Sequence, residues 1–390
     1  MVSYKVGVKV ATNQMATKNG EELNLSMMWV VKDKLQQLFL DKEKIKDQEM
    51  VNGAIEGMVA SLGDPYTVYL PAEQNKSTNE DLAGEFGGVG ISLGFKDKTL
   101  AVMAPLKKTP AEKAGIMAGD LILKITDKVN NVNRETTGIS LDEAVKLIRG
   151  KVGTEVTLKL YREGKADTWE VTLKRENIVV PSVELEWVIS DKTDGKKVAW
   201  IKLYKFTDQL FKDWAKIVGE INTEKAGGKV AGIILDLRDN PGGYLQASVM
   251  VASDFLKEGV VVSQQSAEGK VEKYEVDKSL GRLVNDKLVV LVNGGSASAS
   301  EILAEALKSY NRAKLVGVKT FGKGTVQQPE NFKDGSGLHI TIAKWLLPDG
   351  KNIHGVGVEP DVEVVYEVPK DLKNKTDNQL DKAITVIFQK

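Results

Sequence analysis

The sequence predicts an α/β protein of several domains, and three observations lead to this class. The first is length, because 390 residues correspond to two or three domains of about 150 residues each. The second is the order of the patterns: helical periodicity comes first, then short strands with glycine turns, then alternating strands and helices. The third is composition, since 42% hydrophobic and 28% charged residues fit neither a disordered nor a fibrous chain.

Charge and residue usage exclude several function classes. Lys plus Arg and Asp plus Glu both number 54, so no overall field gathers nucleic acid or anionic lipid, and we expect no nucleic-acid partner. With no Cys and only two His, we expect no metal site and no cofactor. The chain has no apolar run of about 18 residues and no apolar core of a secretory signal. We therefore expect a soluble chain, with removal of a leader left open.

The N-terminal part is predicted to form two amphipathic helices. Apolar residues between Trp29 and Leu62 recur at helical spacing, and Gly63-Asp64-Pro65 ends the second helix. Such apolar faces need a partner, so we expect them to pack against the C-terminal helix NQLDKAITVIFQK of the same chain or of a second copy. The two faces consist of Val31, Leu35, Leu38 and Phe39, and of Val51, Ile55, Met58, Val59 and Leu62.

From Gly84 to about Arg175 the pattern is that of a compact module with one short helix at 140–148. FGGVGISL (86–93) resembles the carboxylate-binding loop and strand of a PDZ domain, and TPAEKAGIMAGDLILKI (109–125) resembles its helix-turn-strand stretch. An ordinary glycine turn explains only the first segment, and a nucleotide-binding loop fits worse because an apolar strand instead of a helix follows Gly88-Val89-Gly90. The resemblance implies that Val89, Gly90 and Ile91 bind a peptide C-terminus. The stretch 129–138 looks longer than the usual hairpin.

After Arg175 strands and helices alternate, which predicts an α/β core. The expected strands are 230–237, 287–292 and 314–318, and the expected helices are 244–256 and 299–310.

One junction in this core could carry chemistry. LVNGGSASASEILAEAL places Ser296, Ser298 and Ser300 between a buried strand and a helix. Ser298 and Glu301 fit the S-x-x-E capping box, so Ser298 could be a helix cap. The same position suits a nucleophile, because the free N–H groups of a helix N-terminus can stabilise an oxyanion. This segment alone leaves both interpretations open.

A serine nucleophile needs a base, and the histidines are poor candidates. His339 lies on an alternating strand and His354 in a glycine-rich turn, so we interpret both as structural, and no serine here has the G-x-S-x-G pattern. Lys323 in TFGKGTVQQ is flanked by glycines, which allow another backbone to enclose it, although most lysines are simply solvated. A lysine base must lose its proton near neutral pH, so we expect Lys323 in a largely desolvated pocket without a carboxylate partner.

Ser298 and Lys323 resemble, in context and spacing, the serine-lysine dyad of the carboxyl-terminal processing peptidases, which are PDZ-containing serine proteases. Further matching segments occur in family order between Ala54 and Val364. These segments are AIEGMVASLGDPYTVYL, ILDLRDNPGG, SASASEI, TFGKGTVQQ and LPDGKNIHGVGVEPDVEV.

The resemblance implies roles for six residues of the core. Ser298 would be the nucleophile, Lys323 the general base and Gln327 a residue that orients Lys323. The oxyanion donors would be the N–H of Ala299 and one from Gly242 or Gly243.

The resemblance also implies architecture and partners. The expected parts are a helical region (1–83), an inserted PDZ domain (84–178), a mixed α/β protease core of the ClpP/crotonase-like type (179–366) and a helical tail (367–390). Substrates would be proteins or peptides with accessible C-termini, the protein a homodimer through its terminal helices, and its location extracytoplasmic. We hypothesise that tail binding to the PDZ domain gates activity. The alternatives are a non-catalytic PDZ scaffold on a degenerate protease fold and a Ser-His-Asp protease.

Overall fold

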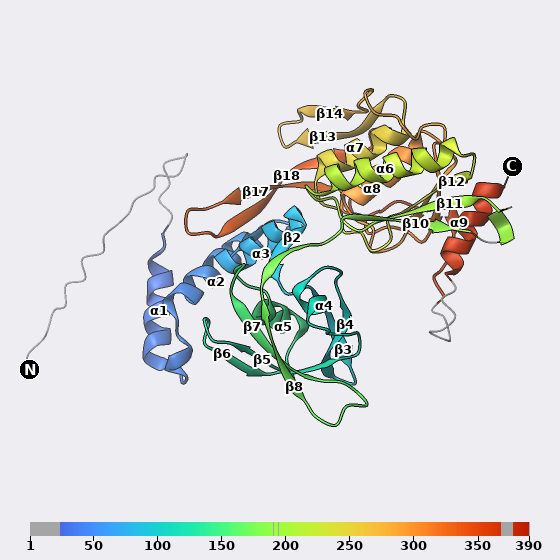
Figure 1. Ribbon diagram of the computed structural model, residues 1–390. Helices are drawn as coiled ribbons and strands as arrows, with labels where there is room; N and C mark the ends of the chain where they lie inside the picture. Colours follow the sequence, from blue (N-terminus) through green and yellow to red (C-terminus); the bar gives the residue numbers. More distant parts are fainter. Residues whose placement is uncertain (1–23, 190, 194, 368–376, 390) are drawn as a thin grey trace, which may run out of the picture. The chain divides into compact units, whose positions relative to one another are not determined.

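The computed structural model describes residues 24–189, 191–193, 195–367 and 377–389 (Figure 1). The chain divides into two compact units, Met1–Tyr69 and Leu70–Lys390, which are described separately. None of the helices within the described residues is both long and apolar enough to cross a bilayer.

The first unit confirms the two predicted helices. Gly63 at φ +69° starts the turn that ends the second one, and the Asp64 carboxylate accepts hydrogen bonds from the Tyr66 N–H and the Thr67 hydroxyl. Several apolar side chains of the first helix are exposed, among them Met27, Trp29 and Leu38. The elements are α1 (Ser26–Leu38), a 3-10 turn (Lys42–Lys44), α2 (Asp47–Ala60) and the short strand β1 (Val68–Leu70) at the boundary.

The second unit begins with α3 (Ala72–Ala83) and the compact module predicted to be a PDZ domain. Its sheet has the order β3-β4-β5-β7-β8, with β6 also paired to β5, and β2 pairs separately with β9. The segment 129–138 contains β6, which forms a short antiparallel hairpin with β5. The bounds are β2 (Glu85–Gly88), β3 (Ile91–Lys96), β4 (Thr99–Pro105), α4 (Pro110–Lys113), β5 (Leu121–Asp127), β6 (Val132–Glu135), α5 (Leu141–Ile148), β7 (Glu155–Tyr161), β8 (Trp169–Lys174) and β9 (Glu176–Val179).

The rest of the second unit is an α/β core around a six-stranded sheet of order β10-β11-β12-β15-β16-β19. β10 is antiparallel to β11, and the other neighbours are parallel. Every predicted strand and helix of this core is found within one or two residues. The bounds are β10 (Val183–Val188), a 3-10 turn (Asp191–Thr193), β11 (Lys197–Leu203), α6 (Leu210–Ala226), β12 (Val230–Asp236), α7 (Leu245–Phe255), β15 (Leu288–Val292), α8 (Ala299–Ser309), β16 (Lys314–Gly317), β19 (Val362–Glu363) and α9 (Asn378–Phe388).

Helices cover both faces of this sheet (Figure 1). α6, α7 and α8 pack on one face, and α9 packs Ala383, Ile384 and Ile387 on the other. The prediction that the C-terminal helix offers its apolar face to the N-terminal helices is therefore wrong, because the central sheet covers that face. A second sheet contains β13 (Val260–Ser266), β14 (Val271–Glu275), β17 (Thr325–Asn331) and β18 (Gly337–Leu346).

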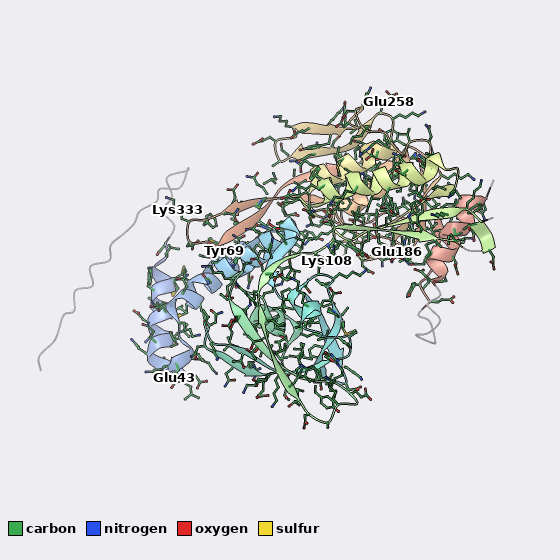
Figure 2. All side chains as sticks on the ribbon, in the orientation of Figure 1. Glu43, Tyr69, Lys108, Glu186, Glu258 and Lys333 are labelled. Carbon is green, nitrogen blue, oxygen red and sulfur yellow. The ribbon has the colours of Figure 1, made fainter. Side chains whose placement is uncertain are left out.

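Ion pairs join charged side chains of the second unit, on which Glu186 and Glu258 are labelled in Figure 2. Glu258 pairs with Lys278, and Glu186 pairs with Lys202. Such exposed pairs each contribute at most about 1 kcal/mol, so the packed cores on the two faces of the sheet carry the stability of this unit.

Candidate active site

The predicted site residues follow three neighbouring parallel strands of the central sheet. Gly242 and Gly243 follow β12, Ser298 follows β15, and Lys323 follows β16. β15 lies between the other two strands and is parallel to both. The carboxyl ends of parallel strands meet at one edge of a sheet, where α/β proteins place their ligands. The fold therefore brings these residues to the same edge.

Ser298 has a strained backbone at the N-terminus of α8. Its φ and ψ angles are +56° and −115°, and its side chain is buried. A residue with a Cβ rarely adopts such a conformation, which costs about 1–3 kcal/mol and tends to occur at functional sites. Sequence reasoning missed this feature because the G-x-S-x-G pattern that usually signals such a turn is absent.

Gly242 provides the space that this turn requires. A Cβ on Gly242 would lie 2.8 Å from the Ser298 Cβ and 3.0 Å from the Ala299 nitrogen. Its φ of +100° is also a conformation that favours glycine. The loop after β12 therefore packs directly on the turn that carries Ser298.

The hydrogen bonds of this loop distinguish the two glycines. The Gly242 N–H donates to the Asn240 Oδ1 at 2.9 Å, and the Gly242 carbonyl accepts from the Phe206 N–H at 2.9 Å. Gly243 packs against Phe206 so closely that a Cβ would lie 2.1 Å from the Phe206 carbonyl oxygen. The N–H of Gly242 is therefore already donated in this arrangement.

The start of α8 confirms the carboxylate half of the predicted capping box. The Glu301 Oε2 accepts the Ser298 N–H at 2.9 Å. The Glu301 N–H donates to the Ser298 carbonyl oxygen at 2.9 Å, and the Ser298 side chain completes the reciprocal half of the box. The predicted capping box is therefore present at the start of α8.

Lys323 lies in a loop that another backbone encloses, as its glycine neighbours predict. A Cβ on Gly322 would lie 2.9 Å from the Gly357 nitrogen, and one on Gly324 would lie 2.5 Å from the His354 nitrogen. The Lys323 N–H donates at 2.9 Å to the Glu301 Oε2. The Lys323 side chain is only partly buried, so the expected largely desolvated pocket is not fully formed in this arrangement.

Gln327 lies on β17 with its amide fixed by two hydroxyl groups. Its Nε2 donates to the Thr325 Oγ1 at 2.9 Å and to the Thr341 Oγ1 at 3.1 Å. The Gln327 amide is therefore held in one orientation by these two hydroxyls.

The two histidines differ in their relation to this site. Burial and the positive charge of Lys323 lower the pKa of His339, so His339 lies within electrostatic range of Lys323. Its buried Nε2 has no hydrogen-bond partner among the described residues, Ser298 included. The His354 Nδ1 accepts the Gly324 N–H at 3.4 Å, so His354 supports the loop of Lys323. Neither arrangement is that of a serine-histidine pair.

In the PDZ domain the predicted peptide-binding residues lie at an edge. β3 is the terminal strand of its sheet and begins at Ile91. Gly90 has a φ of +76°, and the Val89 carbonyl accepts the Ala111 N–H at 2.9 Å. The loop before β3 is thus fixed by α4, while the outer edge of β3 remains available for an added strand.

A serine in a strained turn at a helix N-terminus, with a lysine on the neighbouring loop and a PDZ domain in the same chain, defines a class: a PDZ-containing serine hydrolase. Comparison with known families agrees. Residues 197–364 match the model of peptidase family S41, 87–173 that of the PDZ domain, and 7–74 that of the activating protease CtpB N-terminal domain.

Individual relatives match over most of the chain. A carboxy-terminal-processing protease of Bartonella bacilliformis is 36% identical over 84% of this chain and 72% of the relative. The carboxy-terminal processing protease CtpA of Bacillus subtilis is 39% identical over 82% of this chain and 65% of the relative. The solved structure of a photosystem II D1 C-terminal processing protease is 31% identical, with a TM-score of 0.52, over 87% of this chain and 89% of that one. The chain belongs to peptidase family S41, the carboxy-terminal processing proteases.

Proposed function

We propose that the protein is an endopeptidase that cleaves protein substrates near their C-termini through a dyad of Ser298 and Lys323. One observation carries this proposal. The Ser298 and Lys323 N–H groups donate to the same oxygen of Glu301, each at 2.9 Å. The two backbone nitrogens therefore lie within twice that distance of each other, which is within the reach of a lysine side chain.

The proposed reaction passes through an acyl-enzyme. The Ser298 Oγ attacks the scissile carbonyl carbon, and the neutral Lys323 amine takes the hydroxyl proton and then gives it to the leaving amine. The N–H groups of Ala299 and Gly243 stabilise the oxyanion. A water molecule, deprotonated by Lys323, then hydrolyses the ester. Gln327 presents its carbonyl oxygen to the Lys323 ammonium and limits its orientation.

We propose that the PDZ domain binds substrate tails. An extended C-terminal segment adds to the free edge of β3, and the loop 89–91 holds the terminal carboxylate. Deleting residues 84–175 should abolish the preference for one substrate tail over another, measured as the ratio of kcat/KM values for two tails. An unchanged ratio would refute the recognition role.

We propose that gating by the PDZ domain acts through a short chain of hydrogen bonds. The Ser182 hydroxyl, which follows the last PDZ strand, hydrogen-bonds to the Thr207 hydroxyl. The adjacent Phe206 donates its N–H to the Gly242 carbonyl and accepts the Tyr244 N–H. A displacement of the PDZ domain would therefore be transmitted through Phe206 to the loop of Gly242 and Gly243. Unchanged turnover after PDZ deletion would count against gating.

Cleavage assays on four proteins test the dyad. Wild type, Ser298→Ala, Lys323→Ala and His339→Ala are incubated with an unfolded protein that bears an apolar tail. We expect cleavage by wild type and His339→Ala only. Full cleavage by Lys323→Ala would exclude the dyad, and loss of cleavage in His339→Ala with retention in Lys323→Ala would support a serine-histidine pair. No cleavage by any folded preparation would favour a non-catalytic scaffold.

We further propose an extracytoplasmic location and a homodimer. The exposed apolar side chains of α1 need a partner, and with α9 buried on its own sheet the N-terminal helices are the remaining dimer surface. Light scattering that reports a monomer of 42.6 kDa would count against the dimer.

A further inference from the structure

We propose that Glu301 is a positioning residue: its buried carboxylate fixes the backbone of the nucleophile to the backbone of the base and sets the charge that the base experiences. The inference rests on the proposed dyad of Ser298 and Lys323. It concerns a residue outside that dyad, on the first turn of α8.

The carboxylate of Glu301 is fully buried and accepts four hydrogen bonds. Its Oε2 accepts the N–H groups of Ser298 and Lys323, each at 2.9 Å. Its Oε1 accepts the Thr320 hydroxyl at 2.5 Å and the Gly322 N–H at 2.6 Å. Two donors on each oxygen use the acceptor sites of both carboxylate oxygens. In this geometry the side chain acts only as an acceptor.

The hydrogen bonds of Thr320 fix the direction in which its hydroxyl group donates. Its Oγ1 accepts the Val358 N–H at 2.7 Å, so its own proton is directed to Glu301. Val358 belongs to the same segment that packs on the glycines around Lys323. The loop of Lys323 is thus held by Glu301 on one side and by this segment on the other.

A helix cap alone does not require these contacts. The capping box involves only Ser298 and Glu301, whereas the other three donors to the Glu301 carboxylate come from the loop after β16. A lysine side chain is long and flexible, so fixing its backbone relative to the nucleophile limits the distances that its amine samples. The negative charge also matters, because a carboxylate near an ammonium opposes its deprotonation, and donors on the carboxylate weaken that effect.

The test compares Glu301→Gln with Glu305→Gln, the same substitution one turn further along α8. Glutamine has one acceptor oxygen and adds a donor, so the donors around the other atom lose their partner. For Glu301→Gln we expect kcat to fall about 100-fold with KM nearly unchanged, because ground-state binding is not altered. We also expect the acidic limb of the kcat/KM profile to move to lower pH, because a negative charge near Lys323 is lost. Glu305→Gln should match wild type in both.

Several outcomes would overturn the inference. A folded Glu301→Gln protein with wild-type kcat would overturn it. A reduced kcat with no shift in the acidic limb of the kcat/KM pH profile would also overturn it, because that result indicates a structural role only. If Ser298→Ala and Lys323→Ala are inactive while Glu301→Gln is not, the positioning role fails and the dyad stands. If Ser298→Ala retains activity, the dyad itself fails.

A second pair of variants applies if Glu301→Gln does not fold, as judged by near-UV circular dichroism. Thr320→Val removes one donor from the carboxylate, and Thr320→Ser keeps it. We expect Thr320→Val to lower kcat and to move the acidic limb to higher pH, because the less neutralised carboxylate retains the Lys323 proton. If the two variants have the same kcat and the same acidic limb in the kcat/KM pH profile, the inference is overturned.

Discussion

Replacing Gly242 by alanine should damage the nucleophile more than the fold. The new Cβ would lie 2.8 Å from the Ser298 Cβ, whereas ordinary Cβ contacts lie at 3.4 Å or more, so the Ser298 turn must move by about half an ångström to restore an ordinary contact. Displacements of this order lower turnover by up to about 100-fold. The backbone strain at φ +100° and the contact together cost about 2–4 kcal/mol, less than the stability of a typical domain.

Gly269→Ala is the matched control for this substitution. Gly269 lies in the turn between β13 and β14 at φ +80°, with no atom within 4 Å of an added Cβ. It therefore imposes backbone strain without a collision. Chemical denaturation measures the stability of both variants, and kcat is measured at a temperature where both are folded. Wild-type kcat in folded Gly242→Ala, or equal loss in the two variants, would refute the assignment of Ser298 and the geometry around it.

Two further predictions concern stability. Burial and the charge of Lys323 lower the pKa of His339 below its usual 6.5, so the unfolded chain binds a proton more readily. This contribution to stability is present above pH 6.5 and is lost as pH falls through the native pKa. Between pH 7 and 5 the urea midpoint of His339→Gln should therefore fall less than the midpoint of wild type. An equal fall in the two proteins would refute this prediction. Asp254→Ala should lower the free energy of unfolding by about 3–5 kcal/mol, because the buried Asp254 accepts from the Trp214 indole N–H and from Arg282. A loss below about 1 kcal/mol in a urea titration would show that the two groups find other partners.

The strands that place the site could be predicted because burial on both faces leaves a local signature. β12 and β15 are continuous runs of apolar residues, which is typical of parallel strands covered by helices on both sides. The turn at Gly63-Asp64-Pro65 was equally local, with Gly63 at φ +69° and the Asp64 carboxylate accepting the Tyr66 N–H. Such features depend on residues a few positions apart, so the sequence contains them in full.

Features that depend on distant segments could not be predicted. The strain at Ser298 is tolerated because Gly242, on another loop, has no side chain, and no pattern around Ser298 shows this. The apolar face of the C-terminal helix was evident, but periodicity does not say which surface covers it. Glu301 was predicted only as a cap, because its bonds to Thr320 and Gly322 come from the loop after β16, a separate part of the chain.

In the proposed dyad, the choice of lysine as base explains the role of a buried carboxylate between its loops. A histidine base has a short side chain and is usually oriented by an acceptor behind its ring, whereas a lysine amine ends a flexible four-carbon chain. The position of the amine can be fixed only by fixing the lysine backbone and by packing other atoms around the aliphatic part of the side chain. The fold does the first through Glu301 and the second through the segment that packs on Gly322 and Gly324. Because α8 carries both Ser298 and Glu301, a movement of the helix shifts nucleophile and loop together, and the distance between the reacting atoms is preserved.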